Sequence, residues 1–219
     1  MPGRIGAGAA IIGPIVLLVA TMLHPSGADP NDPVAAFSEY AADRLWVATH
    51  LMAFVGAFLM VICLFALARS LEGDRLRPLA DLAVLVAFAA LATAAILQAV
   101  DGVALKSMVD RWAAAPDAQK QAAFEAALAV RHVEIGVAGF SGFLFGMTGV
   151  LFGVALAASK TYPVWLGWLA ILGGGGTVAG GVLTMFTGFS SVEMNVAMPS
   201  NIIMLVWLVA TGVVMWRRG

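Results

Sequence analysis

Long apolar segments alternate with short polar segments along the chain. Six apolar segments stand out, at residues 5–23, 45–68, 82–100, 135–159, 163–186 and 200–216. Each is nearly free of charged residues, and each is long enough to cross a bilayer, since a helix needs about 20 residues to span roughly 30 Å of hydrocarbon. The pattern predicts an all-α polytopic integral membrane protein, a six-helix transmembrane bundle that forms a single domain over residues 1–219.

The composition supports this class and excludes others. Hydrophobic residues make up 61% of the chain and charged residues 11%, whereas soluble domains carry about 25% charged residues. The net charge of −1 gives no reason to expect nucleic acid as a partner. The single cysteine, Cys63, lies within the second apolar segment, where it cannot form an internal disulfide and is interpreted as a small apolar filler.

Charged residues in the connections predict the orientation. One side of the predicted bundle carries short connections and a modest excess of basic residues, namely Arg4, Arg69, Arg75, Arg77, Lys160, Arg217 and Arg218. The other side carries Arg44, Lys106, Arg111, Lys120 and Arg131 and most of the acidic residues. The positive-inside rule therefore predicts that both termini lie in the cytoplasm. The chain is expected to be a small, bacterial-type, multi-pass protein of the inner (plasma) membrane.

The two longer connections, residues 24–44 and 101–131, then lie outside. Asp32 followed by proline predicts a helix start, and a short helix is expected over residues 34–42. Residues 119–130 are rich in Ala, Gln and Glu and are expected to continue into the fourth span as one long helix. Together these segments predict a small outward-facing helical cap over the bundle.

Three of the predicted spans show faces of small residues that end in polar groups. The fourth span carries glycines at alternating spacings of three and four: Gly139, Gly142, Gly146, Gly149 and Gly153. Such a stripe is typical of close helix packing in membranes, where apolar burial supplies no driving force between helices. The second span places Ala53 and Ala57 below His50, and the third carries Ala83, Ala87, Ala90 and Ala94, followed by Gln98 and Asp101.

The polar ends of these faces predict one shared space. At the start of the fourth span, Arg131 falls within the glycine stripe, His132 lies near its edge, and Glu134 lies about 100° away on an ideal helix. If the small-residue faces meet, one space is surrounded by His50, Gln98, Asp101, Arg131 and His132. An ion pair between Asp101 and Arg131 would then join the third and fourth spans.

All three histidines fall at the outer ends of predicted spans. His24 follows the first, His50 enters the second and His132 enters the fourth. Imidazole and carboxylate are ordinary ligands of transition metals, and two histidines at matching depth can also be axial ligands of haem. The sequence predicts an outward polar pocket that holds a metal or haem, with His50 and His132 as the main ligands, joined by Asp101 or His24. The alternative is that these residues only bond to the backbone, to acids or to lipid headgroups.

The fifth span contains four consecutive glycines, residues 173–176, and then Gly180 and Gly181. Four glycines in a row can unwind a helix, and discontinuous helices mark substrate sites in many transporters. A continuous, tightly packed helix is the other interpretation, because glycine is common in membrane helices.

Three classes of function therefore remain open. The first is a metal-binding or haem-binding protein, the second a small transporter with a broken fifth helix, and the third an accessory subunit without chemistry. A homo-oligomer or a partner membrane subunit fits the small-residue faces, and the lipid bilayer is the one partner that the composition requires. No catalytic motif is specific enough to name a reaction or a catalytic residue, so an enzyme is the less favoured class.

Overall fold

The structure is a computed structural model that describes residues 2–71 and 75–218. Its elements, in chain order, are α1 (Pro2–Leu23), α2 (Pro33–Ala42), α3 (Trp46–Arg69), α4 (Arg77–Leu97), the π-helical η1 (Gln98–Leu105), α5 (Lys106–Ala114), α6 (Asp117–Ala158), α7 (Val164–Thr187) and α8 (Ser191–Arg218). Among the described residues, six helical segments are long and apolar enough to cross a membrane. The predicted helical membrane bundle is confirmed.

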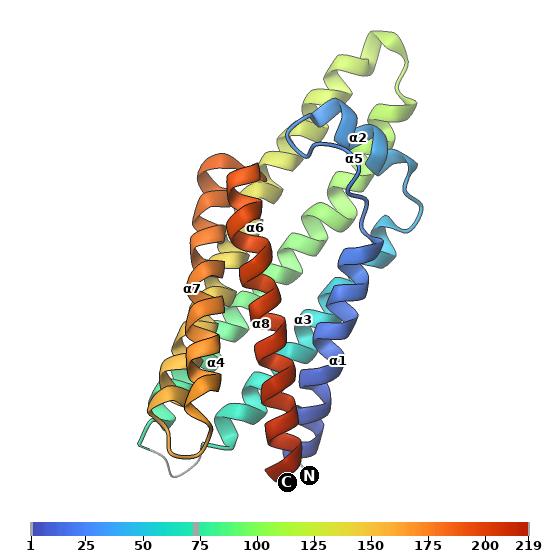
Figure 1. The fold of residues 1–219 in the computed structure, drawn as a ribbon. Helices are drawn as coiled ribbons and strands as arrows, with labels where there is room; N and C mark the ends of the chain where they lie inside the picture. Colours follow the sequence, from blue (N-terminus) through green and yellow to red (C-terminus); the bar gives the residue numbers. More distant parts are fainter. Residues whose placement is uncertain (1, 72–74, 219) are drawn as a thin grey trace.

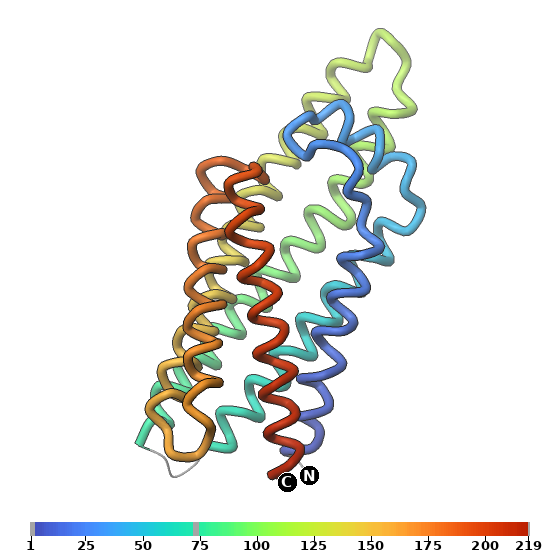
Figure 2. Tube along the Cα trace, in the orientation of Figure 1, coloured from blue at the N-terminus to red at the C-terminus, as the bar shows by residue number. Residues whose placement is uncertain are grey.

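The spanning helices run side by side, and both termini lie at one end of the bundle (Figures 1 and 2). At the opposite end, α2 and the hairpin of α5 and α6 extend beyond the other helices (Figure 1). The third span continues without interruption through η1 and α5, so Arg77–Ala114 is one segment of 38 residues. The fourth span, α6, is one helix of 42 residues, as the composition of residues 119–130 predicts.

The cap at this end is built by local signals in the sequence. The Asp32 carboxylate accepts hydrogen bonds from the backbone N–H groups of Val34 and Ala35, at 3.1 and 3.2 Å, and so caps α2. Phe37 of α2 then packs against Trp112 of α5 and Phe124 of α6, with ring centroids 6.1 and 5.8 Å away. These aromatic contacts fix α2 against the hairpin.

The glycine stripe of α6 lies where α6 crosses α7 at close distance. A Cβ atom added at Gly146 would lie 2.5 Å from the backbone nitrogen of Val178 and 2.6 Å from the carbonyl oxygen of Gly174. One added at Gly139 would lie 2.9 Å from the carbonyl oxygen of Gly181. Glycine is therefore required where the two backbones touch, which is how helices associate in lipid.

The same contacts decide between the two interpretations of the fifth span. α7 is continuous from Val164 to Thr187, so the structure supports the packed, continuous helix and not a break at residues 173–176. A Cβ atom at Gly174 would meet the backbone of α6, and one at Gly180 would lie 2.8 Å from the Cβ of Ala197 in α8. These glycines are explained by helix packing on two sides, because the contacts with α6 and α8 hold α7 in a regular helix.

The alanine faces are also buried in helix contacts. Ala83, Ala87, Ala90 and Ala94 on α4 are all buried, and α4 packs against α6 and α3. On α3, Gly56 faces the backbone of Gly13 and Leu17 in α1. The small-residue faces thus bring α1, α3, α4 and α6 together and align their polar ends.

We expect Gly146→Ala to destabilise the bundle, because the new methyl group would collide with backbone atoms of α7. Overpacking of this kind costs about 1–3 kcal/mol of unfolding free energy. Thermal unfolding in detergent would measure it as a lower Tm than that of the wild type.

Gly136→Ala is the matched control on the same helix. No atom lies within 4 Å of a Cβ atom added at Gly136, and alanine favours a helix by about 1 kcal/mol over glycine in water. The control should therefore unfold at or above the wild-type temperature. Equal Tm values for the two variants would show that the stripe does not limit the approach of α6 and α7.

Candidate functional site

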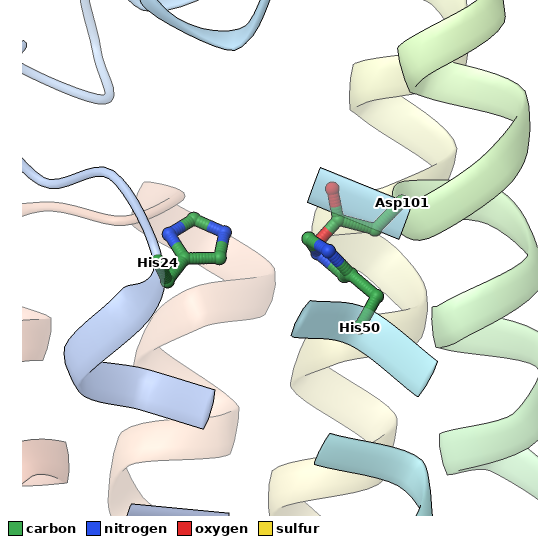
Figure 3. A group of neighbouring side chains, drawn as sticks. All are labelled: His24, His50 and Asp101. Carbon is green, nitrogen blue, oxygen red and sulfur yellow. The ribbon is translucent and has the colours of Figure 1, made fainter. Parts of the chain in front are cut away.

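Three chemically active side chains meet just below the cap. His24 directly follows the last residue of α1, His50 lies one turn into α3, and Asp101 lies in η1. Each offers one ligand atom, and these atoms all lie within 4.8 Å of one another. Figure 3 shows the ring of His24 directed toward His50 and Asp101 across a short gap. Segments separated by up to 77 positions in the chain thus supply one cluster, which we call the His–His–Asp cluster (His24, His50 and Asp101).

The hydrogen bonds of both histidines orient their rings. His24 Nδ1 lies 2.8 Å from the carbonyl oxygen of Pro25, and His50 Nδ1 lies 2.7 Å from that of Trp46. Because a carbonyl oxygen only accepts, each Nδ1 carries the hydrogen. The other nitrogen of each ring, Nε2, is left for the cluster, and His50 Nε2 lies 2.9 Å from Asp101 Oδ2.

The π-helical turn η1 positions the carboxylate. Such turns shift the backbone register within a helix and occur often at functional sites. Here the backbone carbonyl of Asp101 accepts a hydrogen bond of 3.0 Å from Trp46 Nε1. The next residue, Gly102, lets η1 approach α3 closely, since a Cβ atom there would lie 2.6 Å from the Cβ of His50. Trp46 and Gly102 therefore hold Asp101 against His50.

Aromatic rings surround the histidines. The ring centroid of Trp46 lies 4.8 Å from that of His24 and 4.6 Å from that of His50, and the two imidazoles are 5.2 Å apart. Burial lowers the pKa of His24 below its ordinary value, which favours the neutral ring. Burial likewise raises the pKa of Tyr40 in α2, so its phenol stays protonated at neutral pH.

A cavity of about 650 Å³ opens beside the cluster. His24 and Asp101 line it, together with the loop 25–31, residues of α2 and α6, and the start of α8. His50 instead lines a smaller cavity of about 250 Å³, where it lies with Gln98 and Gly102. The cluster therefore lies between the two, with His24 and Asp101 toward the larger cavity.

A buried ion pair forms another wall of the larger cavity. Arg131 Nη1 donates to both carboxylate oxygens of Glu134 at 2.8 Å, and Nη2 lies 3.4 Å from the carbonyl oxygen of Pro30. The guanidinium also lies over the rings of Tyr40 and Phe189, at 5.7 and 4.8 Å from their centroids. Both partners of the pair are buried, so Arg131 connects α6 to the loop and the cap.

The structure does not bring His132 to this site. His132 is exposed, and Arg131 and Glu134 take the inward face of α6 at this level. Successive residues of a helix are rotated by about 100°, so a helix that turns residues 131 and 134 inward turns residue 132 outward. The expected approach of His50 and His132 is replaced by the approach of His50 and His24.

Two other placements also differ from expectation. Glu134 does not point away from the pocket, because it lines the cavity and pairs with Arg131. Arg131 therefore does not form the expected ion pair with Asp101, which binds His50 instead. Gln98 stays close, although on the other side of His50, and its Oε1 is buried without a hydrogen-bond partner among the described residues.

Sequence reasoning missed Tyr40, Trp46 and Gly102 as parts of the site. Trp46, the first residue of α3, is buried. A signal was present in its spacing from His50, since residues four apart share one helix face. The same rule, at a spacing of three, pairs Arg131 with Glu134.

The comparisons with known proteins identify the family without identifying an activity. No curated protein and no solved structure matches this chain. One family model, described as "Domain of unknown function (DUF4386)", matches residues 6–212. The match reaches all six spans and includes every residue of the site, and the chain therefore belongs to the DUF4386 family.

Proposed function

We propose that this protein is an integral membrane protein that binds a divalent transition-metal ion through His24, His50 and Asp101. The observation that carries the proposal is the convergence of two imidazoles and a carboxylate, with ligand atoms within 4.8 Å of one another. Both rings donate Nδ1–H to a backbone carbonyl. This is the arrangement by which metal-binding histidines are usually oriented, with the other nitrogen toward the metal.

Charge supports a cation at this position. His50 lies between two acceptors, the carbonyl of Trp46 at Nδ1 and the carboxylate of Asp101 at Nε2. Because the carboxylate is negatively charged, Nε2 must carry either a proton or a metal ion to lie this close to it. The second oxygen of Asp101, Oδ1, is buried without a hydrogen-bond partner among the described residues. A metal ion would replace the proton on Nε2 and satisfy the carboxylate, and binding would release that proton.

A metal ion fits this geometry better than haem does. Two axial histidines must leave a porphyrin plane free between their Nε2 atoms. Here Nε2 of His50 already lies 2.9 Å from Asp101, and Trp46 packs against both imidazoles. Two histidines with one carboxylate are a ligand set used by zinc and by non-haem iron.

The other two classes of function have less support. The transporter hypothesis depended on a broken fifth helix, and α7 is continuous. An accessory subunit would explain the faces of small residues. It would not explain why an aspartate and two histidines are oriented toward one another at the end of the membrane spans.

We expect His50→Ala and Asp101→Asn to remove the bound metal. Each deletes one of three ligands, and losing a ligand should weaken binding at least as much as losing an outer-shell partner, which costs about 10–100-fold. Protein purified in detergent would be analysed for metals by mass spectrometry, with an absorption spectrum to test for haem. The wild type should hold about one metal ion per chain, because three ligands make one site.

His132→Ala is the matched control, because His132 lies at the same end of the bundle but is exposed. It should keep the wild-type metal content. The proposal fails if the wild type carries no metal after purification and reloading, or if the three variants bind metal equally well. A Soret band that is present in the wild type and lost in His132→Ala would instead support His50 and His132 as axial ligands of haem.

The orientation in the membrane is proposed from the basic residues near the termini. With both termini in the cytoplasm, the His–His–Asp cluster and its cavity open to the outside. We propose single cysteines at Lys160 and Ala118, which lie at opposite ends of the bundle, in a Cys63→Ala background. Lys160 is used because Gly73, the other candidate for labelling at the inner end, lies outside the described residues.

A membrane-impermeant thiol reagent should label Ala118→Cys in intact cells and Lys160→Cys only after permeabilisation. Both positions are exposed, so access to the reagent depends on the side of the membrane. The reverse pattern would place the cluster on the cytoplasmic side.

A further inference from the structure

The cavity beside the His–His–Asp cluster has the size of a small-molecule site. Its volume of about 650 Å³ falls within the roughly 300–1,000 Å³ that is usual for such sites. Two of the three proposed ligands, His24 and Asp101, line its wall, while His50 lies behind them beside the smaller cavity. A metal held by the three residues would therefore face the larger cavity.

The number of protein ligands determines what that metal can do. Structural zinc sites have four protein ligands, whereas catalytic sites have three and keep one position for water or substrate. The His–His–Asp cluster supplies three. Water or substrate could reach the remaining position of such a metal from the larger cavity, because His24 and Asp101 line that cavity.

Glu134 provides a carboxylate in the same cavity. It is 2% exposed, and it lines the same cavity as His24 and Asp101. Arg131 holds its two oxygens at 2.8 Å, which fixes the side chain. A general base must be positioned near the proton that it accepts, and Glu134 is the buried carboxylate of this cavity that is not a proposed metal ligand.

We propose that this cavity is a hydrolytic site for carboxylic esters, a proposal that rests on the metal site described above. The metal, when bound, would activate a water molecule for attack on the ester carbonyl carbon, and Glu134 would accept a proton from this water as the new C–O bond forms. The carbonyl oxygen would take up the negative charge, which the metal would stabilise, while Arg131 would hold Glu134 in place. The C–O bond to the alcohol then breaks, and the proton passes from Glu134 to the leaving alkoxide, so one water and one ester give one acid and one alcohol.

The walls of the cavity indicate the substrate class. Tyr40, Phe189 and Met194 add apolar surface to the charged groups, and Met194 lies in the first turn of α8, at the end of a membrane span. A substrate with a polar ester group and an apolar chain would place the ester at the metal and the chain toward the lipid. Esters of this amphiphilic kind are the class that the cavity fits.

The test uses the full-length protein in detergent, loaded with Co²⁺, whose visible spectrum reports its coordination. Acetohydroxamate, which binds open metal positions, should shift this spectrum. The loaded protein should hydrolyse 4-nitrophenyl acetate and the longer 4-nitrophenyl decanoate faster than the same protein treated with chelator, and acetohydroxamate should inhibit both reactions. A higher kcat/KM for the decanoate than for the acetate would support the amphiphilic class, and the reverse order would overturn that part.

Glu134→Gln should keep its Co²⁺ and lose about 100-fold or more in kcat, the usual contribution of a general base. Glu134→Asp, which keeps the charge beside Arg131, is the second variant if the first does not fold, and it should lose rate with unchanged metal content. Glu193→Gln is the control, since Glu193 is also buried but does not line the cavity. It should hydrolyse at the wild-type rate.

The outcomes separate the two proposals. If the protein does not bind Co²⁺, both the proposed metal site and the proposed hydrolytic activity are overturned. If Co²⁺ binds but neither ester is hydrolysed faster than by the chelator-treated protein, the metal site stands and the hydrolytic proposal is overturned. Wild-type rates in a metal-loaded, folded Glu134 variant would exclude Glu134 as the base.

Discussion

The contact between His50 and Asp101 is the interaction on which the site depends. It joins α3 to the third span through Nε2 and Oδ2 at 2.9 Å, and the indole of Trp46 supports it from the same face of α3. An uncompensated carboxylate at this depth would be costly, because burial without a partner penalises the charged form. The π-helical turn η1 is what brings Asp101 within reach, and Gly102 is what allows the two helices to come close.

Helix packing in the rest of the bundle makes that contact possible. Lipid does not drive helices together by apolar burial, so the crossings rely on small residues. The close approach of α6 to α7 and of α1 to α3 determines where the ends of the helices lie. His24 at the end of α1 and Arg131 on α6 then both reach Tyr40, whose ring centroid lies 6.4 Å from that of His24 and 5.7 Å from the guanidinium.

The sequence predicts the spans well and the site only in part. Segment 45–68 becomes Trp46–Arg69 and segment 163–186 becomes Val164–Thr187, because hydrophobic length is a local property. The third helix runs past residue 100, since a charge such as Asp101 marks a polar environment and does not end a helix. The sequence names His24 as a possible member of the site, but that His24 and not His132 lies beside His50 was not predictable, because it depends on which helices are neighbours. That Glu134 turns inward could have been predicted, because it lies three residues after Arg131 and residues three apart share one helix face.

The position of the cluster at the end of the spans has a physical consequence. Ionisable groups cost less near the membrane boundary than at its centre, so histidines and carboxylates can be retained there without unfolding the bundle. The cap and the loop 25–31 cover the cluster on the side away from the membrane, which keeps His24 and Asp101 half-buried while they line the cavity. A metal ion bound here, as proposed, would be partly shielded from bulk water, and electrostatic interactions are stronger in such an environment than in solution. The end of the spans is thus a position where His24, His50 and Asp101 cost less than at the bilayer centre and still interact strongly with one another.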